Sequence, residues 1–206
     1  MTTPIPYGRH WLDEEDIASV VRTLRADRIT QGPQIQAFEE EVAATCGARF
    51  GVAFSSGTAA LHAACCAAGI GPGDEVVTSA LSFVATANAV VYPGGVPVLA
   101  DIEPTTLNVS LPDVRGRITR KTKAILPVHF AGLPCDMEAV QSLAKEHGLW
   151  VIEDACHALG ASWADSAGQF HRVGCCSHSD MAVLSFHPVK HITTGEGGMV
   201  VTNDPT

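Results

Sequence analysis

The first part of the chain has the hydrophobic spacing of an amphipathic helix. Ile17, Val20, Val21 and Leu24 recur at intervals of three and four residues, which places them on one helical face. The acidic residues 13–16 come just before them, and negative charge is favourable in the first turn of a helix. The pattern therefore predicts a helix that begins at this acidic cluster.

A second helix is predicted over about residues 34–45, after the sequence T-Q-G-P at 30–33 interrupts the first pattern. We expect this helix to bury Ile35, Phe38 and Val42. The two helices together are expected to form an N-terminal helical segment, residues 1–48.

From residue 49 onward, short apolar runs alternate with helical patterns. Strands are predicted at 50–54, 75–79, 96–100, 123–128, 149–153, 181–186 and 199–202, and helices at 58–68, 84–92 and 136–147. Several of these strands are apolar at successive positions, as Val151 and Ile152 are, which two-sided burial requires. The alternation predicts an α/β domain over 49–206, with a mostly parallel central sheet and helices on both faces.

Composition and charge narrow the class of protein. Hydrophobic residues make up 46% of the 206 residues and charged residues only 17%, which excludes intrinsic disorder. The net charge is −9, and basic residues gather only loosely at 115–123, which we interpret as a solvated face. We therefore expect no nucleic-acid partner.

The sequence also predicts a cytoplasmic protein. It has no run of 18 apolar residues that could span a membrane, and its start lacks the charged and apolar regions of a signal peptide. The seven cysteines are odd in number and form no C-x-x-C motif, which favours reduced thiols.

Candidate chemistry lies after three predicted strands, because ligands of open α/β sheets bind beyond the carboxyl ends of the strands. After strand 50–54, Gly57 permits a close backbone approach and the next helix offers free N–H groups to an anion. Ser56 and Thr58 add hydroxyl donors. These residues indicate a phosphate cradle, or alternatively an ordinary helix N-cap. The sequence has neither a dinucleotide-binding nor a P-loop motif here.

The second strand end carries Asp154, in the sequence E-D-A-C-H at 153–157. A carboxylate at the end of a buried strand is costly unless it is paired, so it could hold a cation, a metal or a protonated ring nitrogen. The alternative is a structural carboxylate that caps the next helix. His157 could line the same crevice or be a satisfied core histidine.

The third strand end leads to Lys190, in a loop restrained by Pro188 and by glycines that follow. Most lysines are solvated, but a lysine held near a buried crevice becomes a nucleophile toward carbonyls. Phosphate donors, a carboxylate and an amine are the three anchors that pyridoxal 5′-phosphate (PLP) requires.

Four further residues have the side-chain chemistry of metal ligands. His171, Cys175, Cys176 and His178 are residue types that bind zinc, but two adjacent cysteines do not readily complete a tetrahedral site. We interpret them as ordinary loop residues and expect no metal.

Four motifs resemble the DegT/DnrJ/EryC1/StrS family of PLP-dependent sugar aminotransferases. They are S-S-G-T-A-A-L-H at 55–62, G-P-G-D-E-V at 71–76, E-D-A at 153–155 and S-F-H-P-V-K at 185–190. The resemblance runs from Ile5 to the end of the chain. Within the family, the chain resembles most the subgroup that acts in pseudaminic acid synthesis, at residues 30–33, His157, 179–181 and 185–190.

The resemblance implies the large domain of the aminotransferase fold (fold type I) and assigns roles to individual residues. Lys190 would bind the cofactor covalently and move a proton, and Asp154 would keep the pyridine nitrogen protonated. Phe83 would stack on the ring, although core packing is the alternative, and His157 would reach the 3′-oxygen or the ring face. The phosphate site would comprise Gly57, Thr58, Ala59 and Ser185, with backbone amides of Thr58 and Ala59 and hydroxyls of Thr58 and Ser185.

The implied reaction is transfer of an amino group, with L-glutamate as donor, to the C4 keto group of a nucleotide-linked 4-keto-6-deoxy hexose. A homodimer is implied as well. Family members are roughly twice as long, so the C-terminal small domain is expected to be absent from this chain. His191 stands where the subgroup usually has proline. A PLP-dependent sugar dehydratase and a catalytically silent cofactor-binding fragment remain the alternatives.

Overall fold

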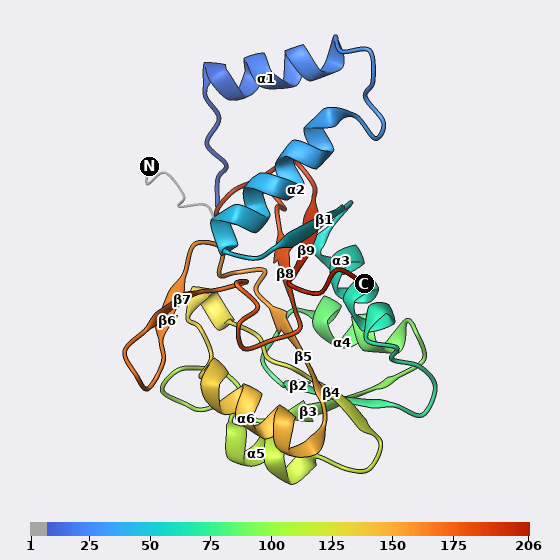
Figure 1. The fold of residues 1–206 in the computed structure, drawn as a ribbon, viewed down its shortest axis with the longest axis vertical. Coiled ribbons are helices and arrows are strands. Elements are labelled where there is room, and N and C mark those ends of the chain that lie inside the picture. Colours follow the sequence, from blue (N-terminus) through green and yellow to red (C-terminus); the bar gives the residue numbers. More distant parts are fainter. Residues whose placement is uncertain (1–7) are drawn as a thin grey trace, which may run out of the picture.

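A seven-stranded sheet forms the centre of the protein, in the order β1-β9-β8-β5-β4-β2-β3 (Figure 1). The structure is a computed structural model and describes residues 8–206. Residues 1–7, which include Ile5, the start of the resemblance, and the beginning of the predicted segment 1–48, lie outside the described residues. Strand β9 is antiparallel to both of its neighbours, and β8, β5, β4, β2 and β3 pair in parallel. The strands are β1 (Phe50–Phe54), β2 (Glu75–Ser79), β3 (Val96–Ala100), β4 (Thr122–Leu126), β5 (Trp150–Asp154), β8 (Met181–Ser185) and β9 (Gly198–Thr202).

Helices cover both faces of this sheet, which confirms the predicted α/β architecture. Helices α3 (Gly57–Ala67) and α4 (Val84–Val91) pack on one face. Helices α5 (Leu111–Arg117) and α6 (Met137–His147) pack on the other face, against β2, β3, β4 and β5, and α2 (Pro33–Cys46) packs at the opposite end of that face, against β8 and β9 (Figure 1). Successive side chains of a strand point to opposite faces, so β8 contributes Val183 to the α3–α4 core and Leu184 to the α2 core.

The N-terminal helices form where the sequence predicts them. Helix α1 (Glu14–Leu24) begins at Asp13, whose carboxylate accepts the N–H groups of Glu15 and Asp16 in a capping box. Its large apolar residues, Ile17, Val20, Val21 and Leu24, are all exposed, and Figure 1 shows α1 standing apart from the sheet beyond α2. No residue of α1 is buried against the rest of the described chain.

Helix α2 packs on the sheet through its second half. Val42 is buried, and the Phe38 ring meets the Phe186 ring edge-on with centroids 4.9 Å apart. The prediction that Ile35 is buried is wrong, because its side chain is 41% exposed. Ile35 lies in the first turn of α2, and the apolar cluster begins one turn later, at Phe38.

Three elements were not predicted: helix α5, the 3₁₀ turn η1 (Phe130–Gly132), and the hairpin of β6 (Ser162–Ala164) and β7 (Phe170–Arg172). Arg115 of the basic stretch lies on α5, and its guanidinium contacts both carboxylate oxygens of Glu146 at 2.8 Å. Both side chains are about half exposed, so the stretch is a solvated face.

None of the helices in residues 8–206 has the length and apolarity needed to cross a membrane.

Candidate active site

A cavity of about 530 Å³ opens beyond the carboxyl ends of β5 and β8, on the face covered by α3 and α4. The predicted site residues reach it from four separate parts of the chain, and only Ala59 is not among the residues that line it. The lining includes Gly57, Thr58, Phe83, Asp154, His157, Ser185 and Lys190.

Asp154 is the last residue of β5 and its carboxylate is held from two sides. Thr86 Oγ1 donates to Oδ2 at 2.6 Å, and the Cys156 N–H donates to Oδ1 at 3.2 Å. The residue is only 5% exposed, and no basic side chain of residues 8–206 forms an ion pair with it. A buried carboxylate in this situation is costly, so the site is suited to a cationic group brought by a ligand.

The alternative interpretation of Asp154, a cap for a following helix, does not match the local structure. Residues 155–161 form turns after β5, and the next regular element is the hairpin strand β6. The bond from the Cys156 N–H is a local turn contact that leaves the carboxylate facing the cavity.

The start of α3 combines the two interpretations of S-S-G-T. Ser56 is the N-cap, and its Oγ accepts the Ala59 N–H at 3.1 Å. The N–H groups of Gly57 and Thr58 find no acceptor among the described residues, and both residues line the cavity. Two free N–H groups at a helix N-terminus, beside a threonine hydroxyl, are suited to bind an anion.

Glycine is required where α3 meets β8. A Cβ at Gly57 would lie 2.9 Å from the Ser185 Cβ and 3.1 Å from its Oγ. Gly198 of β9 is still tighter, because a Cβ there would lie 2.2 Å from the Ser56 carbonyl oxygen. Because both positions are glycine, the start of α3 approaches β8 and β9 closely, which brings the Ser185 hydroxyl near the free N–H groups of α3.

Lys190 lies in the loop that connects β8 to β9. Its N–H donates to the His187 carbonyl at 2.9 Å. The Phe186 carbonyl accepts the Thr193 hydroxyl at 2.9 Å and the Thr194 N–H at 3.1 Å, which closes the loop. Lys190 is half-buried and lines the cavity. Its side chain is therefore held near Asp154 by a loop with defined internal bonds.

His157 and Phe83 lie at the same cavity. The pKa of the half-buried His157 is lowered by burial and by the positive charge of Lys190, which keeps its ring neutral near pH 7. Phe83 is the N-cap residue of α4 and is 68% exposed, so the core-packing alternative for it is wrong. An exposed aromatic at a cavity offers a flat face to a ring-shaped ligand.

The sequence analysis missed Thr86 and Cys156. Thr86 is buried on α4 and holds Asp154, and its Oγ1 also lies 2.6 Å from the Ser82 Oγ. Cys156 lines the cavity, and burial raises the pKa of its thiol well above the ordinary value, so it stays protonated. Thr86 is three residues after Phe83, one helical turn along the same face, which is the signal that could have identified it.

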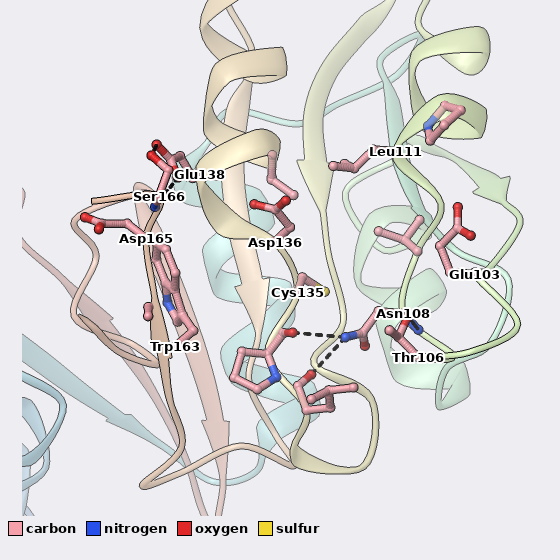
Figure 2. A pocket seen from close by; sticks show the side chains of 16 residues that line it. Glu103, Thr106, Asn108, Leu111, Cys135, Asp136, Glu138, Trp163, Asp165 and Ser166 are labelled. Atoms are coloured by element: carbon pink, nitrogen blue, oxygen red, sulfur yellow. Dashed lines mark hydrogen bonds between the residues drawn. The ribbon is translucent and has the colours of Figure 1, made fainter. Parts of the chain in front are cut away.

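A larger cavity of about 670 Å³ lies on the opposite side of the sheet, between the α6 N-terminus and the β6–β7 hairpin (Figure 2). Its carboxylates serve local structure: Asp136 caps α6, and Glu138 accepts the Ser166 N–H and hydroxyl at 2.9 and 2.7 Å. The residues that line it include no lysine, arginine or histidine, so an anionic ligand finds no counter-charge there.

Of the candidate zinc residues, His171 and His178 contact Trp163, which lines this larger cavity. His171 stacks on Trp163 with ring centroids 4.6 Å apart, and its Nε2 lies 3.0 Å from an Asp165 oxygen. Cys176 is buried, and its thiol donates to backbone carbonyls. Within residues 8–206, no three His, Cys, Asp or Glu side chains converge as metal ligands.

Comparisons with known proteins agree with the geometry. The chain is 44% identical over 200 residues to the spore coat polysaccharide biosynthesis protein SpsC of Bacillus subtilis, covering 97% of this chain and 50% of that protein. It is 36% identical to Helicobacter pylori PseC, an aminotransferase involved in the biosynthesis of pseudoaminic acid, with a TM-score of 0.87 over 97% of this chain and 52% of that one.

A third similar protein is NtdA from Bacillus subtilis, solved with bound cofactor PMP. It is 34% identical, with a TM-score of 0.82 over 94% of this chain and 43% of that one. The chain thus spans about half the length of the relatives it matches. Because residues 10–206 match the family as a whole, the chain belongs to the DegT/DnrJ/EryC1/StrS aminotransferase family.

Proposed function

We propose that the cavity binds PLP and that the whole protein is a PLP-dependent sugar aminotransferase. The observation that carries the proposal is Asp154, a buried carboxylate without a cationic partner among the described residues, in the same cavity as Lys190. The similar NtdA is solved with PMP, the amino form of this cofactor. Family membership supports the same cofactor.

The cavity residues fit the parts of PLP one by one. The free N–H groups of Gly57 and Thr58, with the Thr58 and Ser185 hydroxyls, suit its phosphate. The Ala59 N–H already donates to Ser56 Oγ, so in our proposal Ala59 stabilises the turn and does not itself hold the phosphate. Asp154 suits the pyridine nitrogen, Phe83 the ring face, and His157 the ring's 3′-oxygen or its face.

When bound, PLP supplies an electron sink for negative charge that develops on carbon. The chain's own residues then have separate tasks. Lys190 would hold the cofactor through a bond from Nζ to its aldehyde carbon, formed with release of water, and would carry a proton to and from the reacting carbon. Asp154 would hold a proton on the ring nitrogen, and the bonds that it accepts from Thr86 and Cys156 fix the direction of its carboxylate. Phe83 would shield one side of the ring from water.

We infer that the amino acceptor is the C4 keto group of a nucleotide-linked 4-keto-6-deoxy hexose and that L-glutamate is the donor. SpsC is a spore coat polysaccharide biosynthesis protein, and PseC is an aminotransferase involved in the biosynthesis of pseudoaminic acid, which supports a sugar acceptor. Residues 49–206 would be the cofactor-binding domain and residues 1–48 a helical segment. The working form would be a cytoplasmic homodimer.

The test is to load the full-length protein with PLP and add L-glutamate. We expect the absorbance of the bound aldehyde form to convert to that of the pyridoxamine form, and Lys190→Ala to abolish the conversion. Glu146→Gln, a surface change on α6, is the matched control. A loaded protein that does not respond to glutamate would contradict transamination. If that loaded protein instead releases water from a keto sugar, it is a sugar dehydratase. If it reacts with neither compound, it is a cofactor-binding protein without catalytic activity.

A further inference from the structure

His129 and Glu153 form a buried pair directly behind the cavity. His129 is fully buried and Glu153 is 4% exposed, and His129 Nε2 lies 2.8 Å from Glu153 Oε2. The Cys135 N–H donates to His129 Nδ1 at 3.0 Å, so the ring's proton is on Nε2, facing Glu153. The Ser179 hydroxyl donates to the other oxygen of Glu153. None of these four residues contributes to the lining of the cavity.

The alternation of β5 explains why the pair lies behind the cavity. Ile152 belongs to the core under α3 and α4, and Val151 to the core under α5 and α6. Asp154 therefore points to the same face as Ile152, and Glu153 to the same face as Val151. The two neighbouring carboxylates are separated by the sheet itself.

The same loop that carries His129 also holds the backbone of Asp154. The Asp154 N–H donates to the Pro127 carbonyl at 2.8 Å, and the His129 N–H donates to the Asp154 carbonyl at 3.1 Å. Val128, between them, lines the cavity. His129 therefore contacts the end of β5 twice, through its backbone at Asp154 and through its ring at Glu153.

The loop is fixed at its far side as well. Asn108 accepts the Phe130 N–H at 3.0 Å, and its amide donates to the carbonyls of Leu133 and Pro134, as the dashed lines in Figure 2 show. Ser179 precedes β8, the neighbour of β5. Glu153 thus ties the loop after β4 to the segment before β8, across the strand that carries Asp154.

We propose that His129 and Glu153 are positioning residues that fix the direction of the Asp154 carboxylate, through the backbone of β5 and the loop 127–129. This inference rests on the proposed function, because it concerns the aim of Asp154 toward a ring nitrogen. Neither residue touches the cavity, so neither is a catalytic residue. Their removal should alter how the cofactor is held without removing any group that contacts it.

The test compares full-length parent protein with Glu153→Gln, His129→Gln and the milder Ser179→Ala. The readouts are the dissociation constant for PLP and the pH at which the absorbance of the bound cofactor changes. Leu143→Ala, in the core under α6, is the control for loss of stability alone. We expect Glu153→Gln and His129→Gln to weaken PLP binding about tenfold and to shift the pH midpoint. Ser179→Ala should give a smaller change in the same direction.

Leu143→Ala should lower the melting temperature and leave both readouts as in the parent. Parent-like affinity and pH midpoint in every variant that folds, Ser179→Ala included, would overturn the positioning role. A parent protein that binds no PLP would instead overturn the proposed function, so the two failures are distinguishable.

Discussion

Thr86 Oγ1 lies 2.6 Å from Asp154 Oδ2, and this contact joins the first turn of α4 to the end of β5. Both residues are buried, and Asp154 has no cationic partner among residues 8–206. A hydroxyl that donates to a buried carboxylate holds that carboxylate in one orientation. The contact with Thr86 therefore fixes the direction in which Asp154 meets a positively charged group of a ligand.

The charge of Asp154 is the first feature to test. Asp154→Asn is nearly isosteric: its amide oxygen can accept the Cys156 N–H and its NH2 group can donate to Thr86 Oγ1, so the melting temperature should stay within a few degrees of the parent. The neutral amide cannot hold a proton on the ring nitrogen. We expect the glutamate half-reaction, measured by stopped-flow absorbance, to slow by about a hundredfold or more while PLP stays bound. A rate within about twofold of the parent would mean that Asp154 is structural.

The Thr86 hydroxyl can be removed with little change of shape. Thr86→Val should lower the free energy of unfolding by about 1–2 kcal/mol and the half-reaction rate about tenfold, since Asp154 loses its hydroxyl donor. Thr86→Ser keeps the hydroxyl and is the matched control. Equal rates for the two variants would contradict a role for the hydrogen bond from Thr86 to Asp154.

Gly57 tests the close approach between α3 and β8. In Gly57→Ala the new methyl group would lie 2.9 Å from the Ser185 Cβ and 3.2 Å from the Cys156 sulfur. We expect a loss of about 1–3 kcal/mol of stability and clearly weaker PLP binding, measured by fluorescence titration. Gly116→Ala on α5 is the control, because a Cβ there meets no atom within 4 Å. Unchanged PLP affinity in Gly57→Ala would contradict the cradle.

His157 predicts a pH dependence of stability. Its pKa in the folded protein is lowered by burial and by Lys190, so between that value and the ordinary value of about 6.5 the unfolded chain binds more protons. Stability should therefore fall as the pH drops below about 6.5. Melting temperatures of the parent and His157→Gln at pH 5.5 and 7.5 check this, and the variant should lose less stability on acidification. An equal loss in both proteins would contradict a lowered pKa at His157.

Much of this architecture can be predicted from the sequence because buried parallel strands and their helices leave a strong pattern. The rule that ligands bind beyond the carboxyl ends of strands was enough to bring Gly57, Asp154 and Lys190 together as a hypothesis, and the structure places all three at one cavity. The cofactor roles of individual residues stay predictions. The helix at α5 was missed because it has only seven residues and Gly116 lowers its helical propensity, and β6 and β7 are too short to show alternation.

Other features depend on tertiary contacts that no local pattern records. Val151 and Ile152 are both apolar, so the sequence of β5 does not tell which of Glu153 and Asp154 faces the cavity. His129 is 24 residues from Glu153 in the chain, and Thr86 is 68 residues from Asp154. Ile35 has the helical spacing of a core residue, but the first turn of α2 does not lie over the sheet, so Ile35 is not part of the apolar cluster.

Covalent attachment of the cofactor to Lys190 is the most direct test of the central claim. The full-length protein is incubated with PLP, reduced with borohydride, digested and mapped by mass spectrometry. The phosphopyridoxyl mass is predicted on the peptide that contains Lys190, and it should disappear in Lys190→Ala. The same mass on Lys123 or Lys145, with none on Lys190, would contradict the proposed site.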